Sequence, residues 1–129
     1  MPINPSEFVP KESRWADIFN LLKTKGVNVK SPTTNIGVIT QPTVIVRNSG
    51  VMQHNTFTTE DFGYEVVVCV PENQYSKLEP LVVQVREYMK DLYPMLIDSH
   101  EVSASMYDEE IRAHYMTVAY KNYRRFHNY

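Results

Sequence analysis

The hydrophobic pattern alternates along the chain between a helical repeat and a strand-like repeat. Over residues 11–25, apolar side chains recur at spacings of three and four, which predicts a helix with one apolar stripe. A second helical repeat covers Leu78–Leu92. Ser76 and Glu79 have the spacing of a capping box that would cap this second helix. If Glu79 is the cap instead, Pro80 becomes the first helical residue.

Strand-like patterns fill most of the remaining chain. The strongest is Tyr64–Val70, which is apolar on both faces beyond Glu65 and is therefore expected at the centre of a sheet. The segment 51–62 is polar and has little periodicity, which predicts a long loop or a projecting hairpin. The other predicted strands are 27–30, 43–47, an irregular strand within 95–107, and 111–123.

This order of elements predicts an α+β fold. We expect a mixed, mainly antiparallel sheet of about four to five strands, packed on one face against two helices. The 129 residues suit one domain. We expect an extended arm over 1–12, which contains three prolines, a core over 13–123 and a tail over 124–129.

Composition excludes several classes of protein. The hydrophobic content of 43% is typical of a globular domain. The longest apolar run, Val66–Val70, is far shorter than the ~18 residues of a membrane span, so no membrane partner is expected. The first residues lack a secretory pattern, and Cys69, the only cysteine, excludes an internal disulfide.

Charge is distributed unevenly along the chain. The net charge is only −2, but acidic groups exceed basic groups within 60–110, and basic groups exceed acidic groups elsewhere. Such a division can give complementary patches that orient a partner. Folding can also mix the two segments into an even surface.

We find no motif for catalysis, a cofactor or a metal, and expect a protein that is not an enzyme. The four histidines have no metal-ligand spacing. Asp98 and His100 have the spacing of a general-base pair, but no nucleophile motif accompanies them. A small enzyme or ligand-binding domain would require Asp98, His100 and His114 to converge in one pocket.

Basic and aromatic residues are mixed in Tyr120–Phe126. This composition suits a surface that binds single-stranded nucleic acid, with rings for bases and cations for phosphates. The alternative is an edge strand and tail that use tyrosine in protein contacts.

Several segments together resemble the small tail-terminator or tail-completion proteins of long-tailed bacteriophages. The likeness spans about residues 14–123. The segments that carry it are Arg14-Trp15-Ala16-Asp17-Ile18, the strand Pro42–Val46, the strand Tyr64–Val68, the helix Leu78–Leu92, and the acidic turn and aromatic strand from Asp108 to Tyr120.

The resemblance implies a structural virion protein at the head–tail joint, assembled in the host cytoplasm. Such subunits form a ring, commonly a hexamer, that caps the tail tube and joins it to the head connector. The expected partners are further copies of the chain, the tail-tube protein and the head-connector protein. DNA would pass through without sequence-specific binding. A head-completion or connector-stopper protein of the same joint is the alternative.

The candidate interface lies in two segments. The first is the 51–62 segment, which either inserts against a neighbouring subunit or folds its apolar side chains over its own core. The second is a basic pair near the C-terminus, which we expect to face a protein because tight phosphate binding would retard DNA. The interface residues are Met52, His54, Phe57, Phe62, Arg124 and Arg125.

Overall fold

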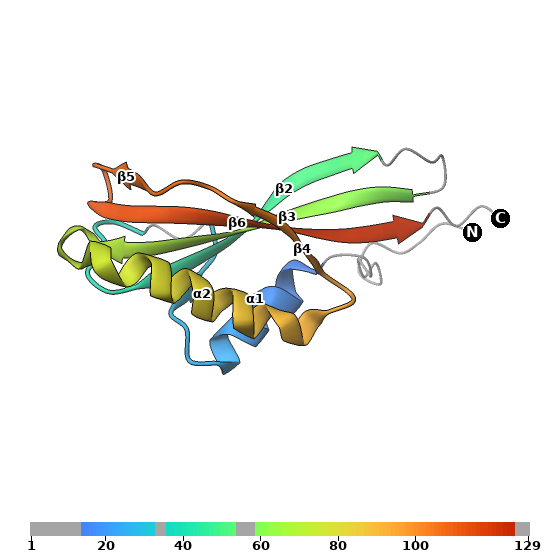
Figure 1. Cartoon of the computed structure of the whole chain (residues 1–129), viewed down its shortest axis with the longest axis horizontal. Coiled ribbons are helices and arrows are strands. Elements are labelled where there is room, and N and C mark those ends of the chain that lie inside the picture. Colours follow the sequence, from blue (N-terminus) through green and yellow to red (C-terminus); the bar gives the residue numbers. More distant parts are fainter. Residues whose placement is uncertain (1–13, 33–35, 54–58, 126–129) are drawn as a thin grey trace, which may run out of the picture.

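The computed structural model describes residues 14–32, 36–53 and 59–125. Of residues 51–53, 59–62 and 123–125 only the backbone is described. The chain has the predicted α+β fold (Figure 1). Its elements are α1 (Trp15–Thr24), β1 (Val29–Lys30), β2 (Thr43–Gln53), β3 (Thr59–Pro71), the 3₁₀ helix η2 (Glu72–Lys77), α2 (Leu78–Met89), the 3₁₀ helix η3 (Lys90–Leu92), β4 (Ile97–Val102), β5 (Met106–Asp108) and β6 (Ala113–Arg125).

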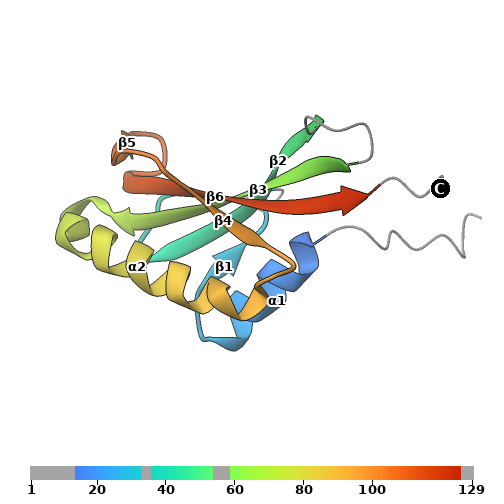
Figure 2. The ribbon, with the colours of Figure 1, turned by 45° about the vertical axis from the view of Figure 1, so that its right-hand side comes forward.

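The sheet is mixed and mainly antiparallel, as predicted. Its strand order is β1-β2-β3-β6-β4, with β5 also paired to β6, and only β1 and β2 run parallel. It has six strands where four to five were expected, because the irregular 95–107 stretch divides into β4 and β5 along the same side of β6. Both helices cover one face of the sheet (Figures 1 and 2).

The strand β3 lies at the centre, between β2 and β6, as its apolar faces predicted. Tyr64, Val66, Val68 and Val70 belong to the main core beneath the helices, together with the buried side chains Ile18, Leu22, Val82, Val85 and Met89. On the opposite face, Val67 and Cys69 form a smaller core with Ile39 and Ala113. Segment 36–42 is attached there by a hydrogen bond in which the Ile39 amide donates to the Ile111 carbonyl at 2.8 Å.

The described part of the 51–62 segment belongs to a hairpin. β2 and β3 pair as far as Gln53 opposite Glu60, and β6 follows β3 as far as Arg125 opposite Thr59. β6 therefore continues two residues beyond the core boundary expected at 123. A register shift between Asn48 and Gly50, where Gly50 has a φ of +106°, introduces an irregularity before the hairpin end.

The predicted capping box of the second helix is wrong. Lys77 occupies the N-cap of α2 without a side-chain cap hydrogen bond, because η2 leads directly into α2 and its 3₁₀ turn takes the place of a capped end. Pro80 is then the third residue of α2, in the first turn, where its missing N–H costs little.

Two hydrogen bonds fix the start of α1 to the sheet. The Arg14 amide donates to the Tyr64 hydroxyl at 2.9 Å, and Trp15 Nε1 donates to the Val46 carbonyl at 2.7 Å. The first helix is thus held at the middle of β2 and β3, and the ends of these strands continue past this anchor.

Candidate functional site

Three strand ends form a ribbon that extends away from the helices. We define the ribbon as residues 48–53 of β2, 59–63 of β3 and 121–125 of β6, which pair with one another. α1 contacts β2 at Val46, and beyond this point the ribbon diverges from the described helices (Figures 1 and 2).

The ribbon brings together four of the predicted interface residues. Met52 pairs with Asp61, and Phe62 lies between Val51 and Asn122. Arg124 pairs with Glu60, and Arg125 with Thr59, so the basic pair lies in β6 and not in a separate tail. His54 and Phe57 lie outside the described residues.

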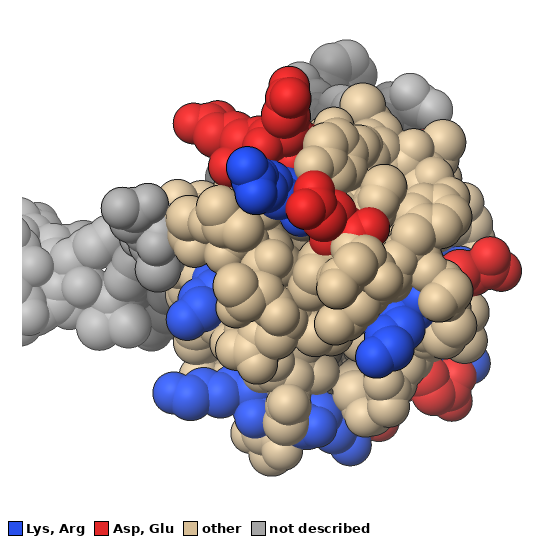
Figure 3. Space-filling view, turned by 90° about the vertical axis from the view of Figure 1, so that its left-hand side faces the viewer, with Lys and Arg blue, Asp and Glu red and all other residues tan. Residues whose placement is uncertain are grey.

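The opposite end of the sheet carries the acidic turn. Asp108 ends β5, and Glu109 and Glu110 follow it in the turn that leads into β6. Figure 3 views the molecule from this end, with one group of acidic side chains in the upper part around a basic side chain, further acidic side chains at the right and lower right, and most of the visible basic side chains below the upper group. β6 therefore begins beside an acidic turn and ends at a basic pair.

Aromatic rings surround His114 at this same end. The ring centroids of Tyr75 and Tyr107 lie 4.7 and 5.0 Å from that of His114. The Tyr107 hydroxyl donates to Glu72 Oε2 at 2.7 Å, and this hydrogen bond raises the pKa of Tyr107. His114 is thus part of an aromatic cluster on the strand surface.

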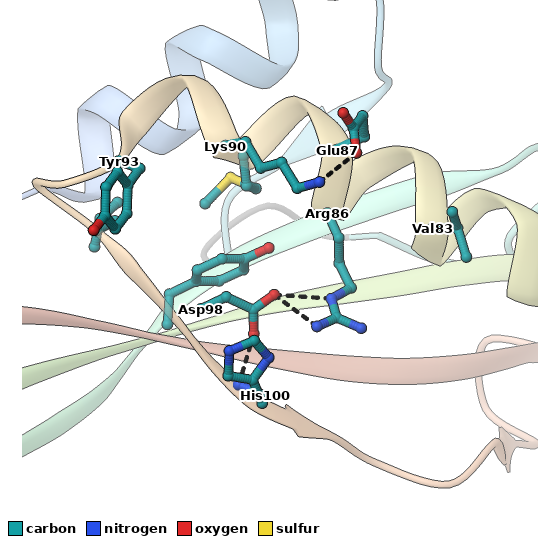
Figure 4. Close-up of a pocket in the computed structure, with 10 residues that line it drawn as sticks. Val83, Arg86, Glu87, Lys90, Tyr93, Asp98 and His100 are labelled. Carbon is teal, nitrogen blue, oxygen red and sulfur yellow. Dashed lines mark hydrogen bonds and ion pairs between the residues drawn. The ribbon is translucent and has the colours of Figure 1, made fainter.

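A pocket of about 590 Å³ lies between α2 and β4 (Figure 4). On one wall, Arg86 Nε and Nη2 both contact Asp98 Oδ2 at 2.9 Å. Asp98 Oδ1 accepts the backbone N–H of His100 at 2.7 Å. The other residues that line the pocket are Val83, Glu87, Met89, Lys90, Tyr93, Leu96 and Tyr120.

A bulge in β4 shapes this wall. Asp98 pairs with Tyr120 and Val102 with Val118, so residues 99–101 lie opposite Ala119 alone. His100 adopts a φ of +61°, which the bond from its N–H to Asp98 supports. The bulge thereby places both Asp98 and His100 at the pocket.

Tyr120 is 3% exposed, and its hydroxyl has no hydrogen-bond partner among the described residues. Burial, and secondarily the charge of Asp98, raise its pKa, so the phenol stays protonated at neutral pH. A buried ring offers no face for a nucleic-acid base. Asn122 is also buried, which removes a second residue of Tyr120–Phe126 from the proposed nucleic-acid surface.

The structure brings together only part of the predicted catalytic group. Asp98 and His100 line the pocket, but His114 lies with Tyr107 at the far end of β6. The Asp98 carboxylate is occupied by Arg86 and by the His100 backbone. Sequence reasoning missed Arg86 and Tyr120 in this pocket, because their meeting depends on how α2 packs against the sheet, which no sequence pattern signalled.

Cys69 is buried at 1% exposure on the face opposite the helices. Burial, with a smaller effect of Asp108, raises its pKa to about 12. This thiol therefore stays protonated and packs as an apolar side chain.

Within the described ranges, no group of three His, Cys, Asp or Glu side chains is arranged to hold a metal ion. None of the helices in the same ranges has the length and apolar character needed to cross a membrane. No protein-family model matches the chain, and no curated protein sequence matches it either.

Proposed function

We propose that copies of this chain assemble head to tail into a ring at the head–tail joint of a tailed bacteriophage. The proposal combines the resemblance of residues 14–123 to tail-terminator proteins with one structural observation. That observation is the ribbon, which extends beyond the described helices and carries Met52, Phe62, Arg124 and Arg125. The ring would cap the tail tube and bind the head connector.

A closed ring requires contact between two different patches of the same chain. β6 supplies two such patches, because the acidic turn precedes its first residue and the basic pair ends it. Its 13 residues separate these groups by about 40 Å, at roughly 3.3 Å per residue. These charges support a contact between the acidic turn of one copy and the basic pair of the next, with Glu60 paired to Arg124 within the subunit.

The sheet edge provides further contact surface. β4 and β5 form one border of the sheet, and exposed edge strands in proteins are commonly paired or covered. Three large side chains near this border are about half exposed. They are Tyr75, Met106 and Tyr107. An adjoining subunit would bury them beside the acidic turn.

Part of the charge imbalance is neutralised within the subunit. Lys25 pairs with Asp91 at 3.0 Å and Arg47 with Glu65 at 2.8 Å, and both pairs join the acidic segment to the basic remainder. Folding therefore mixes the two segments in the middle of the molecule. The ends of β6 are left as the places where complementary charge supports a contact between copies.

A charge-exchange experiment tests this arrangement. Arg124→Glu/Arg125→Glu makes both ends acidic, and Glu109→Lys/Glu110→Lys makes both ends basic, so each variant alone should remain monomeric in light scattering. Mixing the two variants restores opposite charges at every contact and should restore the ring, visible by negative-stain electron microscopy.

The control is Lys23→Glu/Lys90→Glu, which makes the same change in net charge as the arginine variant at two exposed lysines on α1 and η3, away from both ends of β6. It should assemble like the unaltered chain. Failure of the mixture to assemble, or monomers from the control as well, would contradict the head-to-tail contact.

Binding to isolated phage tails and heads distinguishes a tail terminator from a connector-stopper. A tail terminator should label tails that lack heads, whereas a connector-stopper should label filled heads that lack tails. Gold-labelled rings scored by electron microscopy on both particles distinguish these outcomes.

A further inference from the structure

We propose that the α2–β4 pocket binds a small uncharged molecule, with an apolar body and one hydrogen-bond acceptor that receives the Tyr120 O–H. The inference rests on the juxtaposition of this buried hydroxyl with an apolar pocket whose charged groups are already paired. It does not depend on ring assembly.

The size and lining of the pocket suit a small organic ligand. Its volume of about 590 Å³ lies within the roughly 300–1,000 Å³ typical of ligand sites. Met89 and Leu96 are each 2% exposed, and together they provide an apolar floor. Val83 and Tyr93 stand at the mouth with 62% and 69% of their surface exposed. An aromatic or aliphatic body would lie over this floor and cover the exposed surface of Val83 and Tyr93.

The charged residues of the lining favour an uncharged ligand. Arg86 pairs with Asp98, and Lys90 Nζ contacts Glu87 Oε2 at 2.8 Å (Figure 4). Each cation thus already has an anion beside it. A charged ligand would have to displace one partner of a pair and leave the other uncompensated.

The Tyr120 hydroxyl specifies the polar part of the ligand. A buried donor without a partner destabilises the fold, and an incoming acceptor would remove this cost. The hydroxyl is protonated and belongs to a residue that lines the pocket. A ketone or amide oxygen at hydrogen-bond distance would accept its proton, while the ring attached to that group lies on Met89 and Leu96.

Two matched probes test the proposal. Acetophenone has an aromatic body and a carbonyl, and ethylbenzene has nearly the same shape without an acceptor. Titrating each into ¹⁵N-labelled protein should shift the amide signals of residues 83–100 and 118–121 to saturation. Benzoate, the charged analogue, should bind more weakly than acetophenone.

Three variants separate the hydrogen bond from the pocket. Tyr120→Phe should weaken acetophenone binding about tenfold and leave ethylbenzene binding unchanged. Val83→Trp should block both probes at the mouth of the pocket, whereas Val38→Trp, at another exposed valine outside the pocket, should block neither. The proposal is overturned if neither probe gives saturable shifts at these signals, or if Tyr120→Phe binds acetophenone as well as the unaltered chain.

Discussion

Arg86 on α2 and Asp98 on β4 form an ion pair in which Nε and Nη2 both contact Oδ2 at 2.9 Å. The same carboxylate uses Oδ1 to accept the His100 backbone N–H. One side chain therefore ties the last turn of a helix to an edge strand and also holds the bulge of that strand. The pocket wall depends on this arrangement.

We expect the Arg86–Asp98 pair to contribute measurable stability. A double-mutant cycle with Arg86→Met and Asp98→Asn should give a coupling of about 1 kcal/mol in urea unfolding, because both side chains are two-thirds or more buried. The Glu87–Lys90 pair is the control. Its side chains are 68% and 71% exposed, and its coupling should be close to zero. Equal couplings for the two pairs would contradict this account.

Two buried tyrosines of the sheet should respond differently to loss of the hydroxyl. Tyr64→Phe removes the acceptor of the Arg14 amide and should lower the free energy of unfolding by about 1 kcal/mol. Tyr120→Phe removes a hydroxyl without a partner among the described residues, so it should leave stability unchanged or raise it. Chemical unfolding of both variants under identical conditions checks the prediction, and a larger loss for Tyr120→Phe would refute it.

The helices and strands of the core were predictable because their apolar periods match their environments. Tyr64–Val70 shows this most clearly, since its alternate residues enter the two separate cores on either face of the sheet. The helix stripe containing Ile18 and Leu22 is equally regular, and both side chains are fully buried. The local apolar period is sufficient to predict a helix or strand where one of its faces is buried along its whole length.

The strand ends and the pocket were not predictable in the same way. Residues 48–53 contain only two apolar residues, Val51 and Met52, and they become a strand because β3 continues beside them and supplies hydrogen-bond partners. The division of the 95–107 stretch into β4 and β5, and the meeting of Arg86 with Asp98, depend on tertiary contacts with β6 and α2. The predicted capping box was wrong because the helical segment begins earlier in the chain: η2 contains Ser76, which therefore does not stand at a helix start.

The buried thiol of Cys69 should make stability depend on alkaline pH. Its pKa rises from 9.0 to about 12 on folding, so its contribution is fully present below pH 9 and is lost as the pH rises from 9 toward 12. Relative to Cys69→Ala, the unaltered chain should lose roughly 1 kcal/mol of unfolding free energy between pH 8 and pH 10. If the free energy of unfolding of the two proteins changed with pH in the same way, the thiol would have no raised pKa, and the prediction would be wrong.

Native mass spectrometry of the unaltered chain over a range of concentrations tests the central claim most directly. Copies of 15.0 kDa that close into a hexamer should give one dominant species of about 90 kDa, and dilution should convert it to monomer without an open-ended series of larger masses. A single 15.0 kDa species at every concentration would contradict assembly of the chain with itself.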